Sequence, residues 1–329
     1  MGASLTMATG TLLISLDFEL FWGMHDCETI ESYGQNILGG RNAISQLLEL
    51  FKKYDIHASW ATVGMLFAES KTELNQYSPE ENKRPRFENM LLSSYRMFGE
   101  IGDNEEEEPY YYGKSLIDLI AQYPNQEIAS HTFSHYYARE AGQTAEAFEA
   151  DIQAAKHIAR DKGYDVKTMV FPRNQSNPAY EPIMLCNDFV AFRGEEEDWI
   201  HRIRIKPLMR MLRLADSYIN LTGSATYSLE RFQKGELHNF HGSRFLRPYN
   251  HRLKLFEGLK LCRVKSQMKH AAKKGEVFHL WWHPHNIGVD TERNLRNIAE
   301  LLDYYNFLNK KYGMKSKNMI QLSDEINNR

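Results

Sequence analysis

The sequence contains little cysteine and no long apolar run. Its 329 residues include three cysteines, at positions 27, 186 and 262, whose spacing forms no paired motif. This argues against a disulfide framework and favours a reducing compartment. No stretch approaches the roughly 18 consecutive apolar residues that cross a bilayer. The N-terminus also lacks the basic and apolar regions of a signal peptide, so we expect a cytoplasmic protein.

The net charge is also small, because 40 Lys and Arg residues nearly balance 43 Asp and Glu residues and leave a formal charge of −3. The overall charge therefore indicates no class of partner. With 42% hydrophobic residues, the chain is long enough to bury a sizeable core.

Two acids occur where a buried strand should carry none. The apolar or small residues Leu12 to Leu16 predict a strand buried on both faces, and this run ends in Asp17, Phe18 and Glu19. Alternate residues of a strand share a face, so Asp17 and Glu19 would point the same way and repel each other. The pattern suggests a metal ligand or an acid/base pair, and a strand running out into a solvated turn is the alternative.

Two histidines follow a second short apolar segment. His131 and His135 are four residues apart, a spacing that predicts both imidazoles on one face of a helical turn. Two His and one carboxylate are a common set of zinc ligands that leaves a fourth position open for water or substrate. A structural His pair is the alternative, and the upstream acids favour the metal site.

The remaining pattern alternates strands and helices, which predicts a parallel α/β barrel. Functional side chains of such barrels gather at the carboxyl ends of the strands. We expect a loop over residues 23–40 and helices over 41–54, 145–162, 253–274 and 291–311. The expected strands are 12–16, 57–63, 128–129, 168–171, 189–192 and 277–282.

On these residues the chain resembles the polysaccharide deacetylases, the NodB-homology group of carbohydrate esterase family 4. The family closes its first strand with an acidic pair, like Asp17 and Glu19 here, and its second motif is His-Ser/Thr-x-x-His, like 131–135. The resemblance implies a distorted parallel (β/α) barrel over residues 11–322 and one divalent metal. It also implies that Asp17 is the general base and that Glu19, His131 and His135 hold the metal. Zinc is the expected metal, with cobalt, nickel or manganese as alternatives; Glu19 stands where the family usually has Asp.

The resemblance also suggests the remaining catalytic residues. Apolar residues before His283 match the closing motif, in which the family's His is the general acid. Arg173 lies in Phe-Pro-Arg-Asn-Gln, where the family has Arg-x-Pro-Tyr in another order. We assign Arg173 either to keeping Asp17 ionised or to contacting substrate. Asp198-Trp199 is the candidate segment for orienting His283.

Two inserts are expected to interrupt the barrel, and residues 1–10 resemble an irregular leader or tag. The first insert, about 69–113, contains four consecutive Glu and ends in three Tyr, whose rings could stack on a sugar or pack against the barrel. The second, about 199–275, is basic and would attract an anion or form a solvated face. Candidate anions are a sugar nucleotide, a lipid-linked pyrophosphate, an acidic glycan or a membrane surface; nucleic acid is not expected. The residues expected to bind substrate are Trp22, Tyr111, Tyr112, Asn174, Arg244, Arg247, His285 and Asn286.

The function predicted from this resemblance is metal-dependent removal of an N-acetyl or N-formyl group from an amino sugar, in bacterial surface-polysaccharide biosynthesis. One alternative is an allantoinase-like hydrolase acting on a small amide, against which the basic insert counts. A catalytically silent carbohydrate-binding barrel is the other, but a pure binder has no use for a carboxylate pair. The sequence gives no indication of the oligomeric state.

Overall fold

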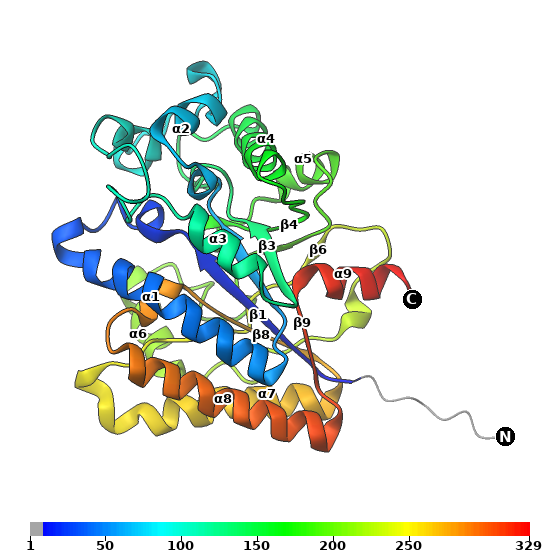
Figure 1. Ribbon diagram of the computed structural model, residues 1–329. Helices are drawn as coiled ribbons and strands as arrows, with labels where there is room; N and C mark the ends of the chain where they lie inside the picture. Colours follow the sequence, from blue (N-terminus) through cyan, green and yellow to red (C-terminus); the bar gives the residue numbers. More distant parts are fainter. Residues whose placement is uncertain (1–8) are drawn as a thin grey trace.

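A parallel β-sheet surrounded by helices forms the centre of the protein, as a computed structural model shows (Figure 1). The structure describes residues 9–329, so residues 1–8 of the expected leader lie outside the described residues. The strand order is β6-β5-β4-β3-β2-β1-β8-β7, and β9 pairs with β1. The strands are β1 (Thr11–Phe18), β2 (Ala58–Thr62), β3 (Gln126–Ser130), β4 (Thr168–Val170), β5 (Ala191–Arg193), β6 (His238–Asn239), β7 (Arg244–Phe245), β8 (Val277–Trp282) and β9 (Lys315–Lys317).

Strand β1 lies in the middle of the sheet, with β2 on one side and β8 on the other. All eight residues of β1 are buried, as are all residues of β2 and β8. Strands covered on both faces require continuous apolar runs, which explains the composition of these segments. The predicted α/β class and distorted parallel barrel are therefore confirmed.

Helices cover the sheet from both sides. Helices α1, α8 and α7 pack side by side along one side, below the sheet in Figure 1, and α4 and α5 lie on the other. The helices are α1 (Ile30–Tyr54), α2 (Lys71–Tyr77), α3 (Lys114–Ala121), α4 (Ala145–Asp161), α5 (Glu181–Cys186), α6 (Lys206–Asp216), α7 (Glu257–Lys274), α8 (Thr291–Tyr312) and α9 (Met319–Asn327).

The loop expected over residues 23–40 is wrong, because α1 already begins at Ile30. Thr29 caps this helix and forms a capping box with Ser32. Its glycines, which suggested a loop, allow a close approach to the turn after β8. A Cβ at Gly39 would lie 2.0 Å from the carbonyl oxygen of Gly288, and one at Gly40 would lie 2.7 Å from the His285 Cα. Tertiary packing therefore outweighs the low helix propensity of glycine here.

The range 199–275 does more than interrupt the barrel. It contributes the short strands β6 and β7, which pair with β5 and β8, and the packed helix α7. Residues 69–113 hold α2 and several 3₁₀ turns. Among the described residues, no helix combines the length and apolar character that a membrane span requires.

Candidate metal centre and active site

The ends of three strands, β1, β3 and β8, supply the central residues of the site. Asp17 lies near the end of β1 and Glu19 directly after it, while His131 and His283 directly follow β3 and β8. Carboxyl ends of parallel strands meet at one edge of a sheet, so residues far apart in sequence come together there. All four side chains meet at this edge, as predicted.

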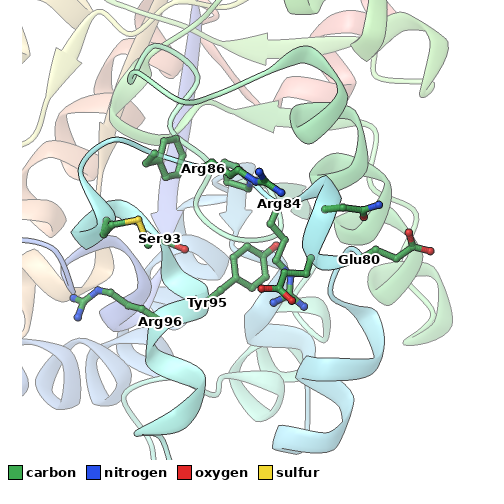
Figure 2. A pocket seen from close by; sticks show the side chains of 11 residues that line it. Glu80, Arg84, Arg86, Ser93, Tyr95 and Arg96 are labelled. Atoms are coloured by element: carbon green, nitrogen blue, oxygen red, sulfur yellow. The ribbon is translucent and has the colours of Figure 1, made fainter.

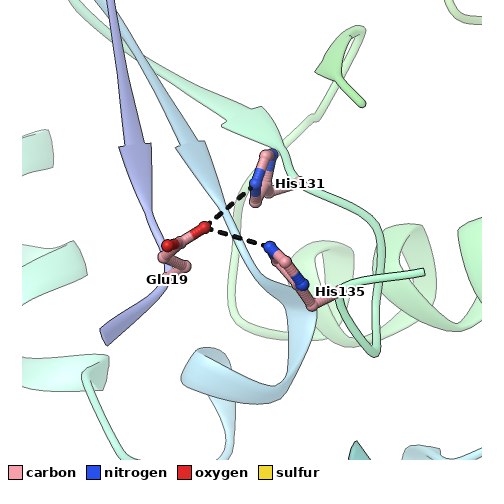
Figure 3. A group of neighbouring side chains, drawn as sticks. All are labelled: Glu19, His131 and His135. Carbon is pink, nitrogen blue, oxygen red and sulfur yellow. Dashed lines mark hydrogen bonds and ion pairs between the residues drawn. The ribbon is translucent and has the colours of Figure 1, made fainter. Parts of the chain in front are cut away.

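The carboxylate of Glu19 faces two imidazoles (Figure 3). Its Oε2 lies 3.3 Å from His131 Nε2 and 3.0 Å from His135 Nε2. All three side chains are buried, and one ligand atom of each lies within 4.8 Å of the others. Burial raises the pKa of Glu19, but neighbouring imidazoles, led by that of His283, lower it well below its usual value. Glu19 is therefore an anion with little solvent around it.

The hydrogen bonds of His131 indicate that this cluster suits a metal ion. His131 Nδ1 lies 2.9 Å from the Val170 carbonyl oxygen, which can only accept, so Nδ1 carries the proton. In the neutral imidazole Nε2 then carries a lone pair. This nitrogen is buried, has no hydrogen-bond partner among the described residues and faces the Glu19 carboxylate. Two such groups repel each other unless a cation lies between them. The Glu-His-His set therefore fits a divalent metal.

The helical turn expected for His131 and His135 is wrong. The segment between them is a loop in which Thr132 (φ 63°) and His135 (φ 56°) adopt left-handed backbone conformations. The Thr132 hydroxyl accepts a hydrogen bond from the backbone N–H of Tyr136 at 2.7 Å, which closes the loop. Both imidazoles still reach Glu19, because the loop turns back toward the end of β1.

Asp151 of α4 holds this loop from outside. Its carboxylate accepts hydrogen bonds from the backbone N–H groups of Phe133, at 2.6 Å, and Ser134, and also from the Ser134 hydroxyl. Burial raises the pKa of Asp151 to about 6, although these hydrogen bonds oppose the rise. The sequence analysis missed this residue, since an acid within a helix pattern reads as a solvated position.

Arg193, at the end of β5, is the partner of Asp17. Its guanidinium donates to Asp17 Oδ2 and to the Ser15 hydroxyl, each at 2.6 Å, and to Asn174 Oδ1 at 3.1 Å. Burial raises the pKa of Asp17, but the Arg193 charge and nearby imidazoles bring the pKa below its usual value. Asn174, expected to bind substrate, instead accepts from Arg193. Because Arg193 follows the apolar pair Ala-Phe at a strand end, the strand-end rule that identified Asp17 and Glu19 would also have identified Arg193.

The assignment of Arg173 as the partner of Asp17 is therefore wrong. Arg173 forms its ion pair with Asp26, at 2.6 Å, and its guanidinium lies 4.7 Å from the ring centre of Tyr137. Its backbone adopts a left-handed conformation (φ 53°), as does that of Asn174 (φ 55°). Contact of this partly exposed side chain with substrate stays a prediction.

His283 lies across from the two acids. Its Nε2 is 3.6 Å from Asp17 Oδ2 and 3.7 Å from Glu19 Oε1, and the side chain is 22% exposed. Its Nδ1 lies 3.0 Å from the Asn286 amide oxygen, which can only accept. Asn286, expected to bind substrate, thus orients His283 and leaves its Nε2 facing the site.

The segment Asp198-Trp199 does not orient His283, contrary to expectation. Asp198 instead caps a local turn and accepts from His201 Nδ1 at 2.8 Å. His285 is also placed differently from the expected substrate-binding position. It is buried, stacks on the ring of His283 with centroids 5.0 Å apart, and burial lowers its pKa to about 3. His285 is therefore a neutral ring packed against His283, and its Nε2 lies 3.9 Å from Glu19 Oε1.

The aromatic side chains expected to stack on a sugar are buried in the core. Trp22, Tyr111 and Tyr112 are each at most 2% exposed. The indole N–H of Trp22 donates to the Tyr111 carbonyl, and the Tyr112 hydroxyl donates to the Gly102 carbonyl. These contacts leave no ring face for a substrate, so the substrate-binding assignment is wrong and packing against the barrel is correct.

The expected anion-binding pair is also engaged within the protein. Arg244 is buried, and its Nη1 lies 2.6 Å from the Asp216 carboxylate, which neutralises it. Arg247 donates to the Ser217 hydroxyl at 2.7 Å, and burial together with Arg213 lowers its pKa. A phosphate site built on these two guanidiniums is not supported.

A separate pocket lies in the 69–113 insert (Figure 2). It has a volume of about 940 Å³, and its lining includes Arg84, Arg86 and Tyr95. None of the residues at the strand ends lines it. The nearby Ser94 links the two regions, because its hydroxyl donates to the Ser134 carbonyl at 2.7 Å. This pocket is therefore distinct from the candidate active site.

The fold is similar to that of polysaccharide deacetylases. No family model matches the chain, and no curated protein matches its sequence. Among solved structures, a Mycobacterium smegmatis protein named as a polysaccharide deacetylase has a TM-score of 0.60 at 10% identity, over 98% of this chain and 92% of that chain. A second such protein, from Pseudomonas aeruginosa, has a TM-score of 0.55 at 11% identity, over 96% and 90%. Puue allantoinase has a TM-score of 0.55 at 11% identity, over 97% and 91%. Likeness at this identity shows the fold alone, and it confirms the predicted NodB-type barrel.

Proposed function

We propose that the protein is a metal-dependent hydrolase that removes an N-acyl group, acetyl or formyl, from an amino sugar. The observation that carries this proposal is the convergence of Asp17, Glu19, His131, His135 and His283 on one edge of the sheet. A carboxylate and two imidazoles then serve as metal ligands, while a second carboxylate and a third imidazole remain for proton transfer. The barrel of polysaccharide deacetylases supports the same assignment.

Glu19, His131 Nε2 and His135 Nε2 would hold the metal, for which zinc is the first choice and cobalt, nickel or manganese are alternatives. A bound divalent ion supplies Lewis acidity, which polarises an acyl carbonyl and makes bound water more acidic. The Val170 carbonyl fixes the tautomer of the neutral His131 ring, in which Nε2 is the ligand atom.

Asp17 is suited to the role of general base. Arg193 and the nearby imidazoles keep its pKa low and hold Oδ2, so the carboxylate is ionised at neutral pH. Its Oδ1 is buried and has no hydrogen-bond partner among the described residues. An oxygen in this state can accept a proton from the attacking water.

His283 is suited to the role of general acid. Asn286 fixes its ring, and Nε2 faces the space above Asp17 and Glu19. Partial exposure lets this nitrogen reach a substrate. Amide cleavage needs such a group, because an amine leaves only after its nitrogen is protonated.

The two histidine roles predict different mutant properties. His131→Ala should lose both metal content and activity, because it removes a ligand. His283→Ala should retain its metal and lose roughly 10²- to 10⁴-fold in turnover, as expected for a lost general acid. Elemental analysis and kinetics of both variants provide the measurement. Near-normal turnover of His283→Ala would show that another group protonates the amine.

The substrate class is tested by measuring release of acetate and formate from N-acylated amino sugars, sugar nucleotides and polymeric glycans. We place the reaction in the cytoplasm and in the biosynthesis of a bacterial surface polysaccharide. The three exposed, unpaired cysteines support a reducing compartment. If none of these amino sugars released acetate or formate, the proposal would be wrong.

Hydrolysis of a small cyclic or linear amide is a second candidate, favoured by the similarity of the fold to Puue allantoinase. The same acid, base and water would serve this reaction. Including allantoin in the substrate panel, with and without a chelator, separates the two candidates.

A further inference from the structure

Helix α6 exposes its apolar side to solvent. Asp216 is its only buried residue, while Ile205, Met211 and Leu214 around it are 63%, 59% and 40% exposed. Leu208, also exposed, continues the same row of residues three apart. A surface helix of a globular protein normally buries such residues. Nothing in the described part of the chain covers them, so this row is available to a partner.

A second exposed apolar segment adjoins α6. Leu255, Phe256 and Leu259, in the turn before α7 and its first turn, are 87%, 49% and 49% exposed. The ring of Phe256 packs edge-on against Tyr218, just beyond α6, with centroids 6.3 Å apart. In Figure 1 the yellow segment around residue 250 lies below α6 on the same side of the molecule. We call the 205–214 row and these three residues the α6 face.

Exposed cations accompany the α6 face. None of them forms an ion pair with a described residue, whereas the acids on neighbouring segments have partners of their own. Glu197 pairs with Arg231, Asp198 with His201 and Asp216 with Arg244. The exposed cations are Arg202, Arg204, Lys206, Arg210, Arg252 and Lys254.

We propose that the α6 face docks onto an anionic lipid bilayer. Exposed large apolar side chains next to unpaired Arg and Lys are the features of helices that lie in the membrane interface. The apolar residues would enter the boundary of the acyl chains while the cations meet anionic headgroups. A second copy fits less well, because an isologous contact would place this basic surface against itself.

Docking there would place the bilayer beside the active site. Phe245 of β7 lines the small pocket that contains Arg213 and Arg247 next to α6. The ring of Phe245 also lies 6.0 Å from that of His283. Helix α6, which carries part of the α6 face, therefore lies close to the carboxyl edge of the sheet. The inference concerns binding alone and does not depend on the proposed reaction.

Co-sedimentation with phosphatidylcholine vesicles, with and without phosphatidylglycerol, tests the proposal on the full chain. Wild-type protein should bind only vesicles that contain phosphatidylglycerol, and high salt should weaken this binding. The triple variant Arg204→Gln/Lys206→Gln/Arg210→Gln should bind roughly 100-fold more weakly, because each Lys or Arg near an anionic surface raises the affinity roughly fivefold. Met211→Gln/Leu255→Gln should also bind more weakly.

Matched control variants remove the same features elsewhere. Lys269→Gln/Lys273→Gln/Lys274→Gln removes three exposed cations from the far half of α7, and Met90→Gln/Phe307→Gln removes two exposed apolar side chains. Both controls should bind as the wild type does. Equal loss in the controls, or no binding to anionic vesicles, would overturn the proposal. So would a stable dimer in size-exclusion chromatography that Met211→Gln/Leu255→Gln converts to monomer.

Discussion

At the scale of single residues, Arg193 shows how one buried side chain organises the site. Its guanidinium contacts Asp17, Ser15 and Asn174 at once and lies 4.3 Å from the Trp281 ring centre. These contacts use the planar fork of donors that only arginine offers. Arg193 therefore fixes both the charge and the position of the proposed base.

Arg193→Lys is expected to separate positioning from charge. A lysine keeps the positive charge but cannot reach the three acceptors together, so kcat/KM should fall roughly 10- to 100-fold with metal content unchanged. Kinetics and elemental analysis measure both properties. Arg173→Lys is the control and should lose less activity, because Arg173 pairs with Asp26 rather than Asp17. Equal losses in the two variants would contradict the assigned pairing.

At the scale of elements, the site depends on a loop that helix α4 holds in place. Asp151 of α4 binds two backbone N–H groups between His131 and His135, and the left-handed residues of that loop need this support. Without these hydrogen bonds the loop is expected to loosen, and the ligands would separate.

Asp151→Ala should weaken metal binding by roughly 10- to 100-fold, because it removes the support of two ligands without removing either ligand. Titration with zinc and a competing chelator measures the affinity. Glu146→Ala, an exposed acid on the same helix, should leave affinity unchanged. Rescue by Asp151→Asn would be partial, since an amide oxygen accepts fewer hydrogen bonds than a carboxylate.

Local sequence pattern predicts the long helices and strands and misses the shortest ones. Long runs with a clear period were located well: the strand expected at 57–63 spans 58–62, and the helix expected at 145–162 ends at Asp161. Strands β6 and β7 have two residues each and no period to detect. The loop expected at 23–40 failed because backbone packing, which no local pattern records, decides the conformation of Gly39 and Gly40. The assignment of Arg173 failed for a similar reason, because the ion pairs of Arg173 with Asp26 and of Asp17 with Arg193 are tertiary contacts that no local pattern records.

At the scale of the whole molecule, Asp216 joins three elements of the 199–275 range. Its carboxylate at the end of α6 lies 2.6 Å from Arg244 of β7 and 3.5 Å from Arg263 of α7. It also accepts from the backbone N–H of Leu221 at 2.8 Å. These buried charges attach α6 to the sheet even though its apolar side faces outward.

Asp216→Asn should reduce the free energy of unfolding by about 3 kcal/mol near neutral pH, because it leaves buried guanidinium charge uncompensated. Burial raises the pKa of Asp216, but the Arg244 guanidinium and the hydrogen bonds to the carboxylate outweigh burial, so the pKa in the folded protein is below its ordinary value of 3.8. A lowered carboxyl pKa stabilises the fold above the unfolded pKa, and this stability is lost as pH falls through the folded pKa. The difference between variant and wild type in urea unfolding should therefore shrink toward about pH 3. If the difference in unfolding free energy between variant and wild type did not change with pH, the ion pair of Asp216 would not be its cause.

The glycines of α1 connect a distant helix with proton transfer. Gly39 and Gly40 touch the turn after β8, where a Cβ at Gly288 would in turn lie 2.0 Å from the Asn36 carbonyl oxygen. That turn also carries Asn286 and, through it, the orientation of His283. The position of the His283 imidazole therefore depends on direct contact between the backbone of α1 and the backbone of this turn, with no side chain between them. Adding a single methyl group on the outer helix would misalign proton delivery while leaving the metal ligands untouched.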